Sequence, residues 1–190
     1  EFDVPVLCMT ASLPKQRVRE LQECGVTLFP DERTLPDLEK ISQMPRYQVY
    51  ALKDEGEAVT VVQDLVSQEK KILWVVNTVE RCQRLAQRFQ AYCYHSRFKL
   101  DDRKKRHDEV IGLFNKPGGV LAITTQVCEM SLDISSDILI SELCPITSMI
   151  QRMGRNNRFA KPGDGTLGEV YFYPPAENVP YSKEDLTGVN

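Results

Sequence analysis

The sequence lacks the features of membrane-spanning and secreted proteins. It contains no apolar run of transmembrane length, and its start shows no signal peptide. Its six cysteines are scattered and form no CxxC pair, which favours free, buried thiols in a reducing cytosol over disulfides. We therefore expect a cytoplasmic protein without membrane attachment.

Ligands for metals and for triphosphates are also scarce. The chain has only two histidines and no clustered cysteines, so we expect no metal site. No GxxxxGK[ST] loop occurs anywhere, so the chain alone lacks the groups that hold a triphosphate and its Mg²⁺. The net charge of −3 excludes bulk electrostatic binding of nucleic acid and leaves only a local groove for such binding.

The length of 190 residues fits one domain, or one domain plus a piece of another. The chain starts with Glu1 rather than Met, so we expect a fragment or a processed piece. Residues 31–46 are polar and interrupted by Pro36 and Pro45, which predicts a connector between two parts of the chain.

Apolar runs alternate with helical apolar spacing from Tyr47 onward, which predicts an α/β fold with a mostly parallel central sheet. We expect strands at 48–52, 72–76, 91–94, 120–124, 138–141 and 170–173. We expect helices at 57–67, from a cap at Asn77–Thr78 to about Gln90, and at 101–114. Before the connector we expect a strand at 4–12, a helix at 15–24 and a short strand at 26–29.

The segment after Ser148 concentrates groups that bind phosphate. If Ser148–Arg158 is helical, then Gln151, Arg155 and Arg158 are spaced i, i+4 and i+7 on one face. An amide and two guanidiniums beside Gly154, which permits close approach, suit the binding of phosphate oxygens. The alternative is a solvated helix end that is rich in arginine.

Polar residues follow several of the expected strands. The carboxyl ends of parallel strands meet at one edge of a sheet, where ligands bind in such folds. The residues placed there are Ser12, Asn77, His95–Arg97, Thr125–Gln126 and the turn after Ser141. Since polar residues follow strands in many proteins, this pattern favours a functional edge only modestly.

Five stretches together resemble a known family. They are MTAS (Met9–Ser12), LWVVNTVERCQRL (Leu73–Leu85), YHSRFKLDDR (Tyr94–Arg103), TTQVCEMSLDI (Thr124–Ile134) and QRMGRNNR (Gln151–Arg158). In order and spacing they resemble the second RecA-like half of a superfamily 2 helicase. Within that superfamily, HSRF followed by the DR pair resembles the helicase–nuclease family of type I CRISPR systems. Asn156–Asn157 and Ser135–Ser136 depart from the family's pattern without removing a charged phosphate contact.

The resemblance implies that ATP is hydrolysed between two RecA-like halves, the first of which supplies the phosphate loop and most Mg²⁺ ligands. It assigns Arg155 and Arg158 as arginine fingers for the charge on the transferring phosphoryl group. Gln151 would orient a γ-phosphate oxygen or the attacking water. Asp133 would accept a hydrogen bond from the nucleotide ribose or couple the two halves.

The resemblance also implies that single-stranded DNA lies across the other edge of the cleft. Its candidate ligands are Thr125, Asn77, Thr78, Ser96 and Arg97, and Thr10 and Ser12 would link hydrolysis to strand movement. The implied partners are the first RecA-like half, a nuclease domain and a CRISPR surveillance complex. The implied domains are 1–30, the end of the first RecA-like domain; 31–46, a linker; 47–173, the second RecA-like domain; and 174–190, an unassigned tail.

Three alternatives stay open. The chain could be a lobe of another superfamily 2 helicase that acts on RNA or in repair, or a non-catalytic binding module of the same fold. A plain nucleotide-binding domain is disfavoured because no Gly-rich loop follows a first strand. His107–Asp108 matches the His-Asp dipeptide that names the nuclease domain found beside these helicases, but a metal site of that kind needs several more histidines and aspartates. The basic run Arg103–His107 is flanked by acidic residues, which favours a solvated helix face over a DNA-binding patch.

Overall fold

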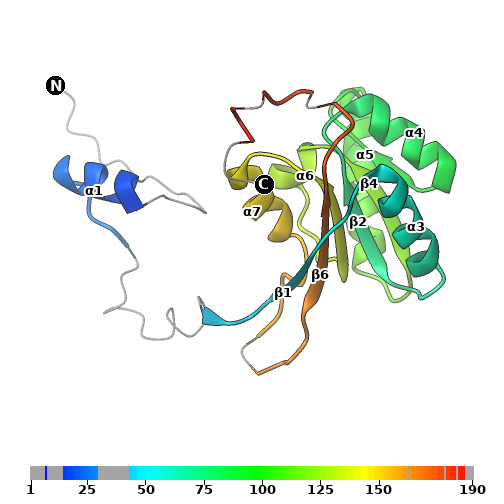
Figure 1. Cartoon of the computed structure of the whole chain (residues 1–190), viewed down its shortest axis with the longest axis horizontal. Coiled ribbons are helices and arrows are strands. Elements are labelled where there is room, and N and C mark those ends of the chain that lie inside the picture. The colour runs from blue at the N-terminus through cyan, green and yellow to red at the C-terminus, as the bar shows by residue number, and fades with distance from the viewer. Residues whose placement is uncertain are drawn as a thin grey trace. The chain divides into compact units, whose positions relative to one another are not determined.

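A six-stranded sheet, entirely parallel, organises the computed structural model, in the order β1-β6-β5-β2-β4-β3 (Figure 1). The strands are β1 Tyr47–Ala51, β2 Lys71–Val75, β3 Tyr92–Tyr94, β4 Val120–Thr124, β5 Ile138–Glu142 and β6 Gly168–Tyr173. All six lie within two residues of their expected positions, which confirms the α/β fold. Since every strand runs the same way, all six carboxyl ends meet at one edge.

Helices cover both faces of this sheet (Figure 1). On one face, α3 (Glu55–Val66) and α4 (Val79–Phe89) bury Val62 and Leu85 against Trp74 of β2. On the other face lie α5 (Leu100–Phe114), α6 (Val127–Ser131) and α7 (Ile146–Met153), which pack against alternate strand residues such as Leu73 and Leu139. Central strands that are buried on both faces are typical of a three-layer RecA-like domain.

The structure describes residues 7, 15–29, 43–161, 163–177, 179–182 and 184–186. The chain forms two units, Glu1–Met44 and Pro45–Asn190. In the first unit, α1 (Lys15–Glu23) confirms the expected helix. The expected strand at 26–29 is wrong: these residues follow Gly25, at φ +84°, as an exposed, irregular segment. Of the expected strand at 4–12, only residue 7 is described, and Thr10 and Ser12 lie outside the described residues.

Local capping explains where two helices begin. Asp54 is the N-cap of α3 and its Oδ1 accepts from the Glu57 amide at 3.0 Å, so this helix begins two residues before the expected position. Thr78 is the N-cap of α4 and its Oγ1 accepts from the Arg81 amide at 3.3 Å, which confirms the expected cap.

The expected helix Ser148–Arg158 is wrong at both ends. The observed α7 begins after Pro145 and ends at Met153, with Gly154 as its C-cap. The next residues leave the helix because Asn156 pairs with Ser136 and Asn157 adopts a left-handed φ of +45°. Residues 154–158, here named the arginine loop, therefore carry Arg155 and Arg158 outside the helix, and the shared helical face does not exist.

Two further segments differ from expectation or had no assignment. No helix was expected after Thr124, but the short helix α6 forms there, and its Ser131 hydroxyl donates to the Val127 carbonyl at 2.6 Å. In the tail, the Glu177 carbonyl accepts from Arg81 of α4 at 2.9 Å, and Leu186 is buried. Within the described parts of the chain, the helices are all too short or too polar to cross a membrane.

Replacing Gly168 with alanine should destabilise the second unit. A Cβ at Gly168 would overlap the Asn156 side chain and lie 2.7 Å from Asn157 Cβ, so the arginine loop would have to move. We expect a loss of about 1–3 kcal/mol in the free energy of unfolding, measured by denaturant titration. The control is Gly112→Ala in α5, where the new Cβ meets nothing within 4 Å. This substitution should leave stability unchanged or raise it. Equal effects of the two changes would contradict this account.

Candidate functional site

The side chain of Arg152 lies at the centre of the carboxyl edge and is fully buried. Its Nε donates to Glu129 Oε1 of α6 at 2.9 Å, and its Nη1 donates to Ser141 Oγ at 2.9 Å and to the Glu142 carbonyl at 3.2 Å. Its Nη2 donates to Asn77 Oδ1 at 3.1 Å. One guanidinium therefore joins α7 to α6 and to the ends of β5 and β2.

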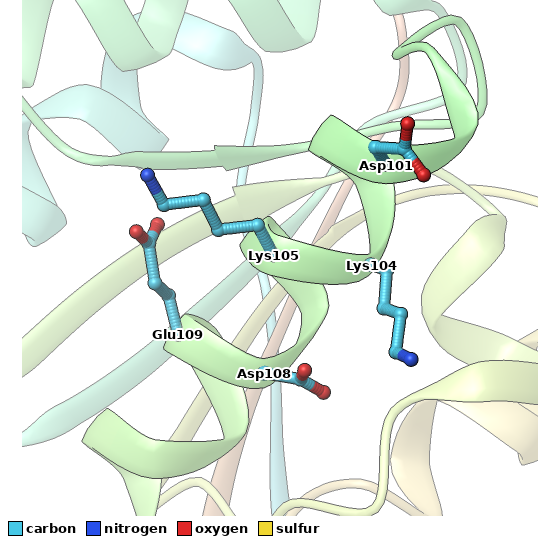
Figure 2. A pocket seen from close by; sticks show the side chains of 5 residues that line it. All are labelled: Asp101, Lys104, Lys105, Asp108 and Glu109. Atoms are coloured by element: carbon cyan, nitrogen blue, oxygen red, sulfur yellow. The ribbon is translucent and has the colours of Figure 1, made fainter.

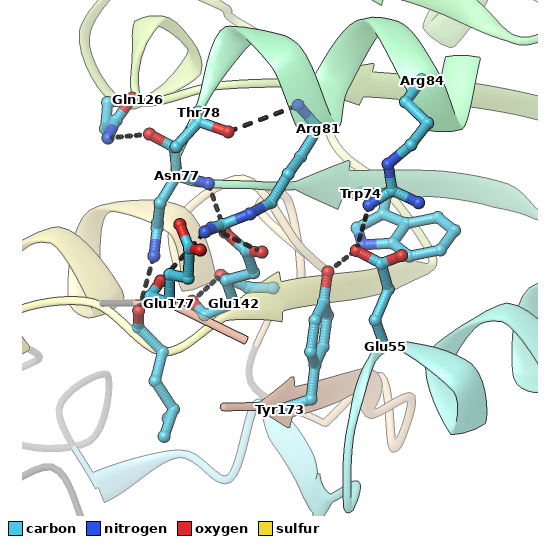
Figure 3. Close-up of polar contacts among 12 residues, drawn as sticks. Glu55, Trp74, Asn77, Thr78, Arg81, Arg84, Gln126, Glu142, Tyr173 and Glu177 are labelled. Atoms are coloured by element: carbon cyan, nitrogen blue, oxygen red, sulfur yellow. Dashed lines mark hydrogen bonds and ion pairs between the residues drawn. The ribbon is translucent and has the colours of Figure 1, made fainter. Parts of the chain in front are cut away.

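A second buried charge network lies beside the first (Figure 3). The Glu142 carboxylate accepts from the Asn77 amide at 2.5 Å and from Arg81 Nη1 of α4 at 3.0 Å. Burial raises the pKa of Glu142, while the bonds from Asn77 and Arg81 act in the opposite direction by favouring the carboxylate. These bonds connect β5 to α4 on the other face of the sheet, so both layers meet at this edge.

Asn77 is the junction between the two networks. Its Oδ1 accepts from Arg152, and its Nδ2 donates to the Leu143 carbonyl at 2.8 Å. Its own carbonyl accepts from Gln126 Nε2 at 2.9 Å (Figure 3). Both polar atoms of the Asn77 side chain are bonded within the protein, so its role here is to position the neighbouring segments, and its expected contact with DNA stays a prediction.

The other expected nucleic-acid residues lie at the ends of neighbouring strands. Thr125 follows β4 and is 3% exposed, while Thr78 follows β2 and is half-buried as the cap of α4. Ser96 and Arg97 are exposed in the turn after β3. Since β2, β4 and β3 are adjacent and parallel, the structure brings these residues to one edge.

The turn after β3 is held by a residue to which the sequence assigned no role of its own. His95 is 2% exposed, its ring stacks on Phe98 with centroids 4.1 Å apart, and its Nε2 lies 3.1 Å from Gln83 Nε2. Its Nδ1 is buried without a hydrogen-bond partner. Burial lowers the pKa of His95, and the charge of Arg97 acts in the same direction.

The arginine loop is fixed to the segment that carries Asp133. The Ser136 amide donates to the Arg155 carbonyl at 2.9 Å, and the Asn157 amide donates to the Ser136 carbonyl at 2.9 Å. The Arg158 amide donates to Ser135 Oγ at 3.0 Å, and Arg158 Nε forms an ion pair with Asp133 Oδ1 at 3.1 Å. Two motifs that are separated in the sequence therefore form one structural piece.

The two loop arginines keep donors available for an anion. Arg155 Nη2 donates to the Glu129 carbonyl at 2.5 Å, but its Nε is buried without a partner. Burial lowers the pKa of Arg155, and the nearby charge of Arg158 acts in the same direction. The side chains of Arg158 and its partner Asp133 are 37% and 73% exposed. Arg158 Nη1 donates to the Gly154 carbonyl at 3.2 Å. The remaining guanidinium nitrogens, Arg155 Nη1 and Arg158 Nη2, suit phosphate oxygens, and Gln151 lies four residues before Arg155.

No motif in the sequence pointed to a role for Arg152, Glu142 or Arg81. One signal for Arg152 was present: it lies three residues after Met149 and one before Met153, both of which pack against the core. That spacing places Arg152 on the inward face of the helix, where a charged residue requires buried partners.

The basic run on α5 is a solvated face of mixed charge, as expected. Figure 2 shows acidic and basic side chains alternating around a shallow hollow lined by Asp101, Lys104, Lys105, Asp108 and Glu109. The ring of His107 instead lies against Tyr94, with centroids 5.9 Å apart. Among the residues that the structure describes, no three His, Cys, Asp or Glu side chains group as metal ligands.

Removing the central guanidinium should strongly destabilise the fold. Arg152→Met would leave the largely buried Glu129 carboxylate and the buried Asn77 Oδ1 without the guanidinium that bonds to them. We expect a loss of about 3–5 kcal/mol in the free energy of unfolding, measured by denaturant titration. The matched control is Arg88→Met, an exposed arginine on α4, which should change stability by less than about 0.5 kcal/mol. A loss below about 1 kcal/mol for Arg152→Met would contradict the central role of this side chain.

The lowered pKa of His95 predicts that stability falls with acidification. The unfolded chain takes up a proton near pH 6.5, before the folded protein does. The contribution of neutral His95 to the free energy of unfolding is therefore complete above about pH 6.5, and it is lost as the pH falls through the folded-state pKa. The difference in unfolding free energy between wild type and His95→Gln should shrink from pH 8 to pH 5. A constant difference over that range would contradict the prediction.

Comparisons with known proteins match this architecture. The family described as CRISPR-associated nuclease/helicase Cas3, C-terminal, matches residues 68–161. A Cas3 nuclease/helicase of Myxococcus xanthus is 38% identical over 96% of this chain and 25% of its own length. One from Methanocaldococcus jannaschii is 33% identical over 96% of this chain and 27% of its own length. The chain thus spans about a quarter of the length of these curated relatives.

Solved structures show the same fold. Crystal structures of T. fusca Cas3, alone or with ADP, ATP or AMPPNP, match with TM-scores of 0.56 to 0.62 and 23 to 27% identity. They cover 77% of this chain and 20% of theirs. A CRISPR RNA-guided surveillance complex, pre-nicking, matches with a TM-score of 0.53 and 24% identity, over 73% of this chain and 20% of that one. The chain belongs to the Cas3-like family of CRISPR-associated superfamily 2 helicases and corresponds to their C-terminal RecA-like half.

Proposed function

We propose that this chain is the second RecA-like half of an ATP-dependent DNA helicase or translocase that acts in type I CRISPR interference. The observation that carries the proposal is the arginine loop, which presents two neighbouring guanidiniums beside Asp133 and is bonded to Ser136, just before β5. The nucleotide-bound T. fusca Cas3 structures support nucleotide binding in this family.

In this proposal, Arg155 and Arg158 meet the negative charge that spreads over the transferring phosphoryl oxygens. The loop is held by backbone bonds to Ser136, so these cations are preorganised and need little rearrangement during the reaction. Gln151 orients a γ-phosphate oxygen or the attacking water. Asp133, whose ion pair with Arg158 is solvent-exposed, exchanges that partner for a nucleotide ribose hydroxyl or couples the two halves.

The first RecA-like half supplies the phosphate loop and the main Mg²⁺ ligands, which this sequence does not contain. We expect the chain alone to show no DNA-stimulated ATPase activity. Thr10 and Ser12, which resemble the coupling motif, link hydrolysis to strand movement in this proposal.

Single-stranded DNA binds along the ends of β2, β4 and β3 in this proposal. Thr125, Thr78, Ser96 and Arg97 contact its phosphates without selecting a base sequence. Asn77 acts mainly by positioning the segments that carry these residues. The nuclease domain and the CRISPR surveillance complex are the proposed partners, in keeping with the names of the relatives and the matched complex.

The test is to join this chain to a complete first RecA-like half and measure ATP turnover with single-stranded DNA. Arg155→Ala and Arg158→Ala should each lower kcat by about 10³–10⁵-fold while DNA binding persists, because phosphoryl charge loses its counter-charge. Thr125→Ala should weaken stimulation by DNA more than basal turnover. Controls are Arg88→Ala and Thr60→Ala, both exposed. Wild-type turnover in both arginine variants would instead indicate a non-catalytic binding module of the same fold.

A further inference from the structure

Arg46 connects the beginning of β1 to the arginine loop. Its Nη2 donates to the carbonyl oxygens of Asn157 at 3.2 Å and of Arg158 at 2.8 Å, across more than one hundred residues of sequence. Both acceptors belong to the backbone of the loop, so Arg46 holds the main chain at Arg158 independently of the conformation of the Arg158 side chain.

The contact is reciprocal and rigid. Asn157 Nδ2 donates to the Arg46 carbonyl at 3.0 Å, and the Gly168 amide of β6 donates to the same carbonyl at 2.9 Å. The Arg46 guanidinium also lies over the ring of Tyr47, 5.7 Å from its centroid. Arg46 is therefore held from three sides, by the loop, by β6 and by the first residue of β1.

The arginine loop needs such support. Asn157 is left-handed at φ +45°, a conformation in which a non-glycine residue requires local stabilisation. The loop is also bonded to Ser135 and Ser136, to Asp133 through the ion pair, and to the carbonyls of Glu129, Glu169 and Thr166. Arg46 adds bonds to the carbonyl oxygens of Asn157 and Arg158.

The neighbouring electrostatics agree with this arrangement. Burial raises the pKa of Tyr47, and the charges of Arg46 and Arg158 both act to lower it. Both guanidiniums are therefore close enough to influence the same phenol. Arg46 is also the second residue of the unit Pro45–Asn190, so these contacts are made where the chain enters this unit.

From these contacts we infer that Arg46 is a positioning residue for Arg158, holding the arginine loop so that the finger guanidinium meets the nucleotide. This inference rests on the proposed function, because it gives Arg46 an effect on turnover only through Arg158. Arg46 touches no reacting group and is not a catalytic residue. Losing it should displace the finger, and a displacement of about 1 Å can lower a catalytic rate by about 10²-fold.

The experiment is a double-mutant cycle in the protein that joins this chain to a complete first half. Arg46→Met should lower kcat for ATP by about 10- to 100-fold and leave the KM for ATP nearly unchanged. In an Arg158→Ala background the same change should cost less than about twofold, because the guanidinium that Arg46 positions, that of Arg158, is already absent. The matched control is Arg88→Met, whose guanidinium lies 5.8 Å from the centroid of Phe89 but contacts no loop carbonyl.

Hydrogen exchange separates a positioning role from a general loss of structure. The Arg158 amide, which donates to Ser135, should exchange faster in Arg46→Met. The Gly168 amide, which donates to the Arg46 carbonyl, should stay protected because that bond belongs to the backbone. If Arg46→Met does not fold, Arg46→Lys, which keeps the charge and donors on a shorter chain, serves in the same cycle.

The outcomes distinguish this inference from the proposed function. If Arg158→Ala alone leaves turnover unchanged, the finger assignment fails and this inference fails with it. If Arg158→Ala abolishes turnover but Arg46→Met costs as much in that background as in wild type, only the inference fails. Unchanged kcat in Arg46→Met overturns it directly. A large loss in wild type that vanishes in the Arg158→Ala background supports it.

Discussion

The buried bond between Arg152 and Glu129 is the constraint on which the carboxyl edge of this domain depends. A guanidinium without solvent contact is tolerable only when its donors are all satisfied, and here α6, β5 and β2 each supply an acceptor. That requirement sets where α7 lies relative to the sheet. The position of α7 in turn sets where the arginine loop begins.

The parallel sheet provides the rest of the geometry. Its strand order brings the ends of β2, β4 and β3 together on one side and those of β5, β6 and β1 on the other. The first group carries the residues proposed for DNA. The arginine loop is bonded to the amino ends of β5, β6 and β1, at Ser136, Glu169 and Arg46. Asn77, which bonds to both charge networks, lies where the two groups meet.

Much of this architecture was predictable from the sequence, because strands and amphipathic helices leave periodic apolar patterns. The six strands, three of the long helices and the Thr78 cap follow from such local signals. The motif resemblance also identified the family, which the comparisons confirm.

What the sequence did not predict depends on contacts between distant residues. α7 ends at Met153 because Asn156 bonds to Ser136, twenty residues earlier, and no local pattern records that bond. The buried partners of Arg152 and Glu142 are likewise far apart in the chain, so their charges looked like ordinary surface charges. Arg46 lay at the end of a polar connector, and only the fold shows that it reaches the arginine loop.

The central claim is that the arginine loop faces a nucleotide bound by a first RecA-like half. The most direct measurement is a structure of the joined protein with a non-hydrolysable ATP analogue. The account predicts guanidinium nitrogens of Arg155 and Arg158 at about 3 Å from γ-phosphate oxygens, with the loop still bonded to Ser136. A nucleotide bound in that interface with both guanidiniums directed away from its phosphates would contradict the account.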